Sequence, residues 1–535
     1  MDFTAYGHET SLLFLLLSYS VLASLPAARA QKRPDAPTPP DAPAQTARTE
    51  LPLTAFESEV HVQALPADST VVLLVGRNKG LSNKSTFGFQ QYDKDLHLRH
   101  ELALEMPQEF GFTRMCAEGN TVYALFTSTS TPGRLFAAAY NGRLGQVRTQ
   151  QYDTRLSREI VDLKALDGRL FATVLLNDQL HVTALLLDVA SGQMQYLSSI
   201  YEPLPTQLTF VADAASRRAE YVLSQTNGRK SRLLLKQLTD RGQLVSSEFV
   251  QAESERSLIT AQLTPPQDTT ARLLMGTYSL RDPSFAQGLF ATDLRPTAGT
   301  GAKPPLRFYD FLHLKHFFDY LKPSRQARLR EQTQRRVARS EPPKRWHYRL
   351  LLHELLPQPD GGYVLVAEVY YPHYRYNSYG NLPPSFYNGP QYGYGNGNAR
   401  VFDGYQTTHA LVCGFDRSGT LLWDNTFVVE NLRRTDLEEA VRLQPLPDGR
   451  LVLAYIDEEK LRYKVINRAE TSSNDHEVPL QTGTGATAAA ERVSDTSQAD
   501  LLPWFGTRFV ASGYQRIHVD HGPDREVFFL NSVAF

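Results

Sequence analysis

The chain contains 535 residues, of which 41% are hydrophobic and 21% charged, a composition typical of a folded globular protein. Its 56 basic and 57 acidic residues almost cancel, so the charge gives no reason to expect nucleic acid as a partner. Only two cysteines occur, Cys116 and Cys413, and both fall inside apolar strand patterns of well separated units. We therefore expect two buried free thiols, and a fold stabilised by its hydrophobic core.

Residues 1–30 have features of a signal peptide. The apolar run from Leu12 to Leu25 is too short to span a bilayer comfortably, and Ala28–Ala30 has the small-x-small form of a cleavage site. An uncleaved N-terminal anchor is the alternative. No later segment is apolar for long enough to cross a membrane, so we expect an exported protein, periplasmic or secreted, with no membrane span after cleavage.

Residues 31–50 are rich in Pro and Ala and lack any apolar period, which predicts a flexible or polyproline-like linker. The folded domain is expected to begin near Leu51 and to include residues 51–535.

A recurring four-strand unit organises this domain. Its clearest copy has predicted strands at Ile160–Leu166, Arg169–Leu176, Leu180–Val189 and Met194–Ile200, separated by turn signals such as Asp167-Gly168. The second strand of each copy marks the repeat; these strands start at Val71, Thr121, Arg169, Glu220, Arg272, Gly362, Arg450 and Thr507. The first four intervals are 50, 48, 51 and 52 residues, and the next two, of 90 and 88, indicate large insertions.

The repeat predicts an all-β fold, a single β-propeller of about eight four-stranded blades, with seven as the alternative count. Several second strands are apolar on both faces, as expected where neighbouring sheets cover both sides. A pair of β-sandwiches is the competing architecture, but sandwiches lack a steady four-strand period. The last unit supplies three strands, and Thr49–Phe56 could add the fourth from the N-terminal side and close the ring.

Two turns between third and fourth strands carry a resemblance to known propellers. Asp188–Gly192 and Asp416–Gly419 each place Asp a few residues before Gly, and Trp423 follows the second turn. This pattern resembles the blade turn of quinoprotein-like and WD40-like propellers, in which a Trp follows the turn. Residues 348–429 are also similar to an uncharacterised family of exported propeller-like proteins. The resemblance implies a fold; it transfers no quinone-binding or calcium-binding residue, and we expect no cofactor.

The first insertion, residues 305–345, breaks the β pattern and predicts two helices. The first would carry an apolar stripe ended by Pro323, formed by Phe308, Phe311, Leu314, Phe318 and Leu321. Ser324 could cap the second, whose surface is strongly basic up to Pro342 through Arg325, Arg328, Arg330, Arg335, Arg336 and Arg339. One interpretation is a helical hairpin packed outside the ring. The other is a docking surface, with Arg328, Arg335 and Arg336 contacting an acidic protein or an anionic envelope polymer.

The second insertion, residues 370–405, is dense in Tyr, Gly, Asn and Pro. Tyrosine offers a flat apolar face with a polar tip, so we expect a ligand-binding loop that stacks on sugar rings or a peptide. The candidate ligand-binding residues are Tyr374, Tyr376, Tyr379, Tyr387, Tyr392 and Tyr394. The alternative is a long loop folded over its own blade.

No motif identifies a catalytic residue or a metal site. His518 and Asp520 share one face of a predicted strand, and His313 and His316 lie one helical turn apart, but neither pair has a third ligand at a recognisable spacing. We therefore predict no metal and no catalytic residue.

The leading hypothesis is an exported propeller that binds a peptide or glycan, or serves as a scaffold. The alternative is an enzyme acting on a polysaccharide or small metabolite in the central channel. That alternative predicts a polar axial pocket with carboxylates from at least two blades. A third possibility is an assembly role through the basic helices.

Overall fold

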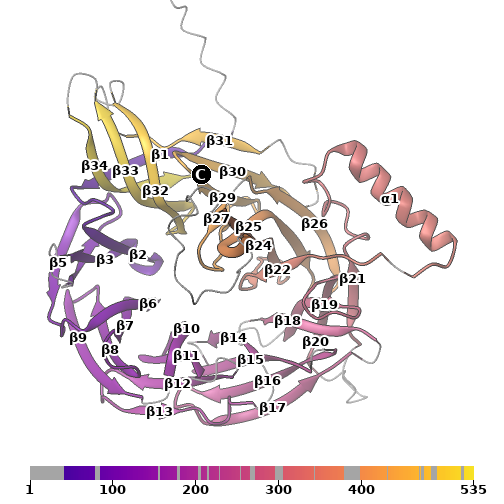
Figure 1. Cartoon of the computed structure of the whole chain (residues 1–535), viewed down its shortest axis with the longest axis horizontal. Helices are drawn as coiled ribbons and strands as arrows, with labels where there is room; N and C mark the ends of the chain where they lie inside the picture. Colours follow the sequence, from indigo (N-terminus) through magenta and orange to yellow (C-terminus); the bar gives the residue numbers. More distant parts are fainter. Residues whose placement is uncertain are drawn as a thin grey trace, which may run out of the picture. The chain divides into compact units, whose positions relative to one another are not determined.

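The computed structural model describes residues 41–535, except for 79–84, 155–156, 177–180, 203–205, 214–215, 228, 253–254, 265–271, 296–304, 343, 379–397, 431, 469, 471–474, 483–490 and 520–522. Residues 43–535 form one compact unit. Its described strands form eight antiparallel sheets arranged in a ring, which confirms the predicted β-propeller with eight blades (Figure 1).

The first four blades are continuous four-stranded meanders. Blade 1 contains β2 (Ser58–Leu65), β3 (Thr70–Asn78), β4 (Ser85–Tyr92) and β5 (Leu98–Leu104), with a short 3-10 turn η1 (Pro66–Asp68) after its first strand. Blade 2 contains β6 (Phe110–Glu118), β7 (Thr121–Ser128), β8 (Arg134–Asn141) and β9 (Gln146–Asp153). Blade 3 contains β10 (Ser157–Leu166), β11 (Arg169–Leu176), β12 (Val182–Asp188) and β13 (Met194–Tyr196). Blade 4 contains β14 (Thr206–Asp213), β15 (Arg218–Thr226), β16 (Ser231–Thr239) and β17 (Leu244–Val250).

The other four blades complete the ring. Blade 5 contains β18 (Ser257–Leu263), β19 (Leu273–Ser279), β20 (Gly288–Asp293) and β21 (Arg307–Asp310). Blade 6 contains β22 (Arg349–Leu352), β24 (Tyr363–Ser378), β25 (Asn398–Phe415) and β26 (Leu421–Val428), with short β23 (Leu356–Pro357) and β27 (Arg433–Arg434) paired alongside. Blade 7 contains β28 (Arg442–Pro445), β29 (Leu451–Asp457), β30 (Lys460–Ile466) and β31 (His476–Pro479). Blade 8 contains β32 (Glu491–Pro503), β33 (Arg508–Val519), β34 (Arg525–Ala534) and β1 (Ala44–Leu51).

The hydrophobic core is divided among the blade interfaces. In the described chain, eight clusters of buried side chains each join two adjacent blades. Strand β3 shows why: Val72 and Leu74 pack toward blade 2, whereas Val71 and Leu73 pack toward blade 8. Because successive side chains of a strand point to opposite faces, a strand covered on both sides must be apolar throughout. The two-sided apolar pattern seen in the sequence therefore reports the ring architecture.

The N-terminal strand closes the ring, but at a different position from the one expected. β1 spans Ala44–Leu51 and pairs antiparallel with β34, from Ala44 opposite Ala534 to Leu51 opposite Phe528. The strand thus begins seven residues before Leu51, and the predicted strand at Thr49–Phe56 was shifted toward the C-terminus. The linker prediction for residues 31–50 was wrong for residues 44–50, because pairing with a free strand edge satisfies their backbone without an apolar pattern.

The first insertion contains one helix where two were expected. α1 (Pro323–Ala338) confirms the basic helix; Pro323 is its first residue, so Ser324 lies inside the first turn and does not cap it. Residues 311–322 form turns and bends, and the predicted first helix was wrong. Three residues of its apolar stripe are still buried, because Phe311, Leu314 and Phe318 pack between blades 5 and 6, whereas Phe308 lies on strand β21. Burial of these side chains made the spacing look helical.

Side chains satisfy the backbone of that segment in place of a helical ladder. The amide of Leu312 donates to Asp310 at 2.9 Å. The amides of Lys315 and His316 donate to the carboxylate of Asp424 on β26, at 3.0 and 2.6 Å. Because Asp424 comes from the next blade, the sequence of the insertion alone could not reveal this conformation.

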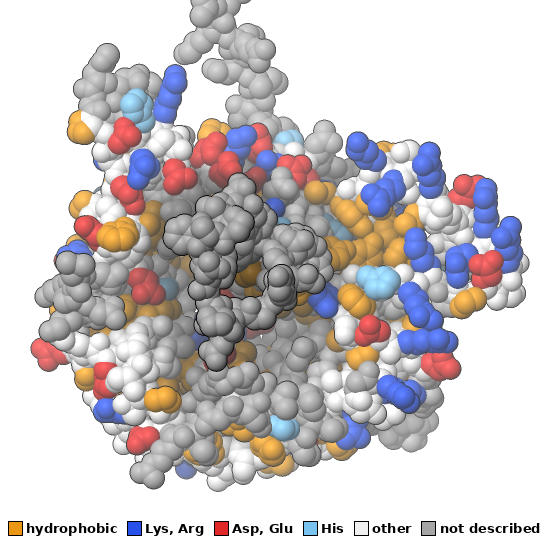
Figure 2. Space-filling view, in the orientation of Figure 1, with side chains coloured by type: hydrophobic (Ala, Val, Ile, Leu, Met, Phe, Trp, Pro, Cys, Tyr) orange, Lys and Arg blue, Asp and Glu red, His pale blue; other side chains and the backbone are white. Residues whose placement is uncertain are grey.

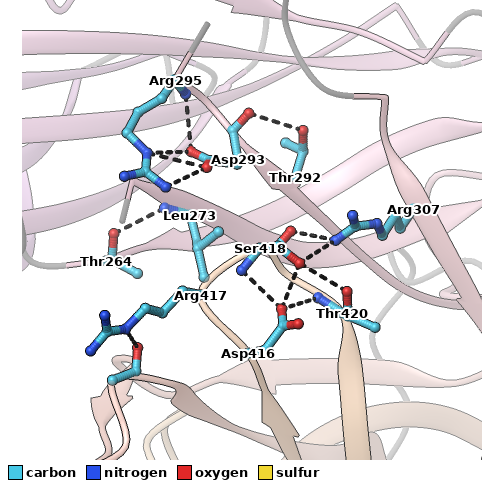
Figure 3. A network of polar contacts seen from close by, with 11 residues as sticks. Thr264, Leu273, Thr292, Asp293, Arg295, Arg307, Asp416, Arg417, Ser418 and Thr420 are labelled. Carbon is cyan, nitrogen blue, oxygen red and sulfur yellow. Dashed lines mark hydrogen bonds and ion pairs between the residues drawn. The ribbon is translucent and has the colours of Figure 1, made fainter. Parts of the chain in front are cut away.

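The Asp-to-Gly blade turns have the expected local structure. Asp416 Oδ1 accepts hydrogen bonds from the amides of Ser418 and Thr420, both at 2.8 Å, and Gly419 adopts the left-handed φ of 78° (Figure 3). Burial raises the pKa of the Asp416 carboxyl, but these hydrogen bonds outweigh it and hold the pKa below its ordinary value. Arg307 on β21 donates to both oxygens of Ser418, so the turn also ties blade 6 to blade 5.

Both cysteines are buried free thiols, as predicted. Among the residues placed by the structure, no helix is long and apolar enough to cross a membrane.

Candidate functional site: a polar cleft at the ring axis

A cleft of about 330 Å³ opens at the inner edges of four blades. Its lining comes from β2, β6, β28 and β32, the innermost strands of blades 1, 2, 7 and 8, with contributions from β33 and β34. The lining residues that can make polar contacts through their side chains are His61, Gln63, Thr113, Arg114, Glu438, Arg442, Gln498, Asp500 and Ser512. The volume lies at the lower end of the roughly 300–1,000 Å³ of small-molecule sites, so the cleft fits a small ligand or a short stretch of a chain.

Two inner strands that line the cleft carry bulges. The pairing of β6 with β7 shifts between Phe112 and Arg114, and that of β32 with β33 shifts between Ser497 and Asp500. Gln498, in the second bulge, adopts a left-handed φ of 50°. Bulges bend a strand and redirect its side chains, and backbone strain of this kind gathers at functional sites. Both bulges place polar residues at the cleft.

An aromatic pair joins blades 1 and 2 in the lining. The imidazole of His61 stacks on the ring of Phe112, with centroids 3.6 Å apart and planes inclined by 23°. Glu59 fixes the imidazole through a hydrogen bond of 2.8 Å to Nε2. The amide of Gln63 lines the cleft two residues further along the same strand. Planar rings beside an amide suit a ligand with both an apolar face and polar edges.

Arg114 and Glu438 are the charged lining residues that form no ion pair within 4 Å among the described residues, although Glu438 helps to raise the pKa of nearby Arg442. The half-buried guanidinium of Arg114 donates to its neighbour's carbonyl oxygen at Thr113, 3.3 Å away, and makes no ion pair with a described carboxylate. The exposed carboxylate of Glu438 likewise has no ion-pair partner within 4 Å among the described residues. A guanidinium carries five N–H donors, so Arg114 retains most of its capacity to bind a ligand.

The other charges of the lining are neutralised. Asp500 accepts from Arg434 at 3.2 Å and lies 3.7 Å from Arg442, which also pairs with Glu439 at 3.1 Å. Burial lowers the pKa of Arg442, but the charges of Asp500 and Glu439 outweigh burial, so the net pKa is raised. These ion pairs connect the chain between blades 6 and 7 with blade 8 and fix one wall of the cleft.

A buried pair lies behind this wall. Glu368 on β24 accepts from the amides of Ala440 and Val441, both at 2.8 Å, and its Oε1 lies 2.9 Å from His353 Nε2. Burial alone lowers the pKa of His353, but Glu439 and Glu368 outweigh it, so the net pKa is raised. Glu368 therefore anchors the start of blade 7 to blade 6.

An ion pair also joins blades that are not neighbours. Lys164 on β10 of blade 3 contacts Glu354 of blade 6 at 2.8 Å. Blades 3 and 6 are separated by two others, so this contact bridges the ring interior. The cleft therefore lies on the side of the axis bounded by blades 7, 8, 1 and 2.

The predicted tyrosine-rich insertion is in part an extension of blade 6. β24 and β25 continue as a two-stranded hairpin to the pair Ser378 and Asn398, and Tyr374 lies opposite Phe402. Tyr374 and Phe402 are 42% and 46% exposed, and their rings contact edge to face at 5.9 Å. Tyr376 lies on β24; Tyr379, Tyr387, Tyr392 and Tyr394 lie outside the described residues.

The base of this hairpin connects to the cleft. Tyr405 and Gln406 on β25 pair with β27, and Tyr405 lies opposite Arg434. Arg434 in turn binds Asp500 in the cleft lining. In Figure 1, β24, β25 and β27 are drawn within the ring, whereas α1 lies at its outer edge. The described strands of the second insertion therefore lie apart from α1, although burial raises the pKa of Tyr371 on β24 and Tyr320, before that helix, is near enough to raise it further.

The predicted partner-binding arginines lie on α1, where basic side chains gather in Figure 2. Arg328 is exposed, and no described carboxylate lies within ion-pair distance of it. Arg335 pairs with Glu331 one turn away at 2.5 Å, and Arg336 donates to the carbonyl of Pro342 at 2.9 Å. Arg336 thus contributes to the helix end, whereas Arg328 is available to a partner.

The two weak metal hypotheses gain no support. His518 Nδ1 lies 2.7 Å from Asp524, while Asp520 is outside the described residues. His316 is buried beside Asp319 at 2.7 Å, and His313 is exposed. Within the described ranges no three His, Cys, Asp or Glu side chains gather as metal ligands.

No motif or repeat in the sequence singles out the residues of the cleft. Glu59, His61 and Gln63 do alternate with apolar residues along a predicted inner strand, a signal for one polar face. However, Arg114, Arg442 and Asp500 belong to other repeats, and ring closure is what brings them together.

No family model matches this chain, and no curated protein matches it. Solved structures similar to it include the Dos1 propeller, with 8% identity and a TM-score of 0.42 over 92% of this chain and 95% of that chain. The β-propeller domain of the trilobed protease from Pyrococcus furiosus has 6% identity and a TM-score of 0.33 over 79% and 96% of the two chains. The polysaccharide lyase Uly1 has 8% identity and a TM-score of 0.38 over 78% and 89%. Similarity at this level carries no information about ligand or activity.

Proposed function

We propose that this protein is an exported binding propeller that recognises a polar chain, peptide or glycan, at the axial cleft and the adjoining aromatic hairpin. The observation that carries the proposal is the composition of the cleft, where an aromatic pair, an amide and the charged side chains of Arg114 and Glu438 come together from separate blades. The apolar run and the small-x-small site within residues 1–30 support export.

The hairpin supports the same proposal. Its aromatic side chains extend beyond the hydrophobic core, and Tyr371, Tyr374 and Phe402 are each more than a third exposed. Rings of this kind bind flat apolar surfaces of a ligand at little cost in side-chain entropy. The remaining candidate tyrosines, from Tyr376 to Tyr394, belong to the proposal as predictions.

An enzyme acting in the channel is the second candidate. The cleft does contain carboxylates from two places, Glu438 before blade 7 and Asp500 in blade 8. Two arginines already neutralise Asp500, whereas hydrolysis by paired carboxylates requires one acid and one available base or nucleophile. The charge arrangement therefore favours binding.

Glycan and peptide arrays test the proposal with purified wild-type protein and two variants. His61→Ala removes the ring stacked in the cleft, and the double change Tyr374→Ala with Phe402→Ala removes the exposed pair of the hairpin. Each lost aromatic contact should weaken binding about 2-fold to 10-fold.

The matched controls are His100→Ala, on the outer strand of blade 1, and Tyr201→Ala, an exposed tyrosine away from the hairpin. Neither control should change binding. Unchanged binding in both test variants would contradict the proposal, and turnover of an arrayed ligand would support the enzyme instead.

A further inference from the structure

Arg114 distinguishes the cleft from the rest of the axial region. Arg434 and Arg442 each contact a carboxylate, and Lys164 pairs with Glu354. Arg114 has no such partner among the described residues, although it is half-buried at a bulge of an inner strand. An arginine held partly out of water without a counter-ion loses solvation that an anionic ligand can restore.

The neighbours of Arg114 favour a sugar over a peptide. A peptide side chain is usually anchored in an apolar pocket, but nine of the fourteen residues that line the cleft carry polar side chains, and its stacked pair is His61 and Phe112. A pyranose has an apolar face for such rings and hydroxyls at its edge for the amide of Gln63.

Glu438 limits how much negative charge the ligand can carry. Its exposed carboxylate lines the same cleft and has no ion-pair partner in the described chain. It repels an anion placed near it, whereas Arg114 attracts one. A ligand with a single acidic group flanked by neutral units suits both residues better than a dense polyanion.

We infer that the cleft binds a polysaccharide in which acidic sugars alternate with neutral ones, with Arg114 as the residue that binds the acidic group. This inference rests on the proposed binding function and specifies its ligand class. The anion is a carboxylate or a sulfate, both of which accept hydrogen bonds from a guanidinium.

Isothermal titration calorimetry of the full chain tests the inference with a matched pair of ligands. The first is a hyaluronan octasaccharide, in which uronate alternates with a neutral sugar, and the second is the same octasaccharide with its carboxyl groups reduced to alcohols. A sulfated chondroitin octasaccharide provides the sulfate arm, and alginate provides a dense polyuronate. We expect an acidic octasaccharide to bind about 10-fold or more tightly than the reduced one.

Three variants should change the affinity in different directions, a pattern that loss of folding would not produce. Arg114→Gln should weaken acidic binding about 10-fold to 100-fold, and Glu438→Gln should strengthen it about 2-fold to 5-fold. Arg148→Gln, the same change on the exposed outer strand of blade 2, should have no effect. Thermal melts of all three should match the wild type.

The outcomes separate this inference from the proposed function. Equal binding of the acidic and reduced octasaccharides, with loss in His61→Ala, would overturn the inference and leave the binding function standing. Binding of an acidic peptide in place of both octasaccharides would overturn it as well. Absence of binding to every saccharide and peptide would overturn both.

Discussion

Blades 1 to 5 and blades 6 to 8 use the same four-stranded unit in different ways. In the first group each blade is one continuous stretch of chain, and the second strands follow one another at nearly constant intervals. In the second group the chain extends a hairpin from blade 6, adds β27 beside it and recruits β1 to complete blade 8. The cleft lies where the second group meets the beginning of the first. The regular blades 1 and 2 supply His61 and Arg114 to the cleft, and the irregular second group supplies the opposite wall with Arg442 and Asp500.

The interfaces of blades 1 to 3 and those of blades 6 and 7 also differ in whether they bury carboxylate and histidine side chains. Interfaces among blades 1 to 3 are packed with aliphatic and aromatic side chains. The junction of blades 6 and 7 buries the pair of Glu368 and His353. Another histidine of blade 6, His409, is fully buried and stacks on Tyr320 at 4.1 Å. The junction of blades 6 and 7 is therefore more sensitive to a change in charge or pH than the interfaces among blades 1 to 3.

Removal of β1 should have the largest effect on stability, because blade 8 of the second group depends on this strand. A chain that starts at Pro52 leaves blade 8 with three strands and exposes the edge of β34, so we expect aggregation and loss of stability on the order of the total, roughly 5–15 kcal/mol. Size-exclusion chromatography with light scattering would measure it. A chain that starts at Asp41 retains β1 and should remain folded; a folded monomer from both chains would show that the ring closes without β1.

Glu368→Gln tests how far the junction of blades 6 and 7 depends on one buried charge. The amide keeps one acceptor oxygen but loses the charge that binds His353 and two backbone amides, so we expect a loss of about 1–3 kcal/mol. The matched change Glu354→Gln affects an exposed carboxylate paired with Lys164 and should cost less than about 1 kcal/mol. Urea denaturation measures both, and equal losses would show that the junction of blades 6 and 7 is no more sensitive than the surface.

The smallest expected effect is a change in how steeply the free energy of unfolding depends on pH. Burial lowers the pKa of His409 to about 3, so the unfolded chain takes up the proton first as pH falls below about 6.5. The contribution of His409 to stability is therefore complete above that pH and is lost toward pH 3, by at most about 1.4 kcal/mol per pH unit. His409→Phe should remove this slope, which the difference between wild-type and variant denaturation curves from pH 7 to 4 measures.

For His353 we expect the pH dependence of stability to have the opposite sign. Its net pKa is raised in the folded chain, so its contribution is present below the unfolded value of about 6.5 and is lost as pH rises through the folded value. His353→Gln should therefore reduce stability more at pH 6 than at pH 8. The same sign in both variants would contradict the assignment of these two environments.

Local sequence patterns were enough to predict the repeat, the eight second strands, the basic helix and the two buried thiols. These features depend on local patterns: a strand covered on both faces is apolar throughout, and a turn with Asp and Gly has its own backbone requirement. Each predicted second strand starts within two residues of its position in the structure, as at Arg169 and Gly362, where β11 starts at Arg169 and β24 at Tyr363.

Three features depend on contacts between residues that are far apart in the sequence. Residues 311–322 are not helical because Asp424, more than a hundred positions later, binds their amides. β1 is a strand because β34 offers it an edge. The cleft exists because ring closure places His61 and Arg114, from the first two blades, beside Arg442 and Asp500, from the last two. A site assembled from distant segments leaves no local pattern in any of them.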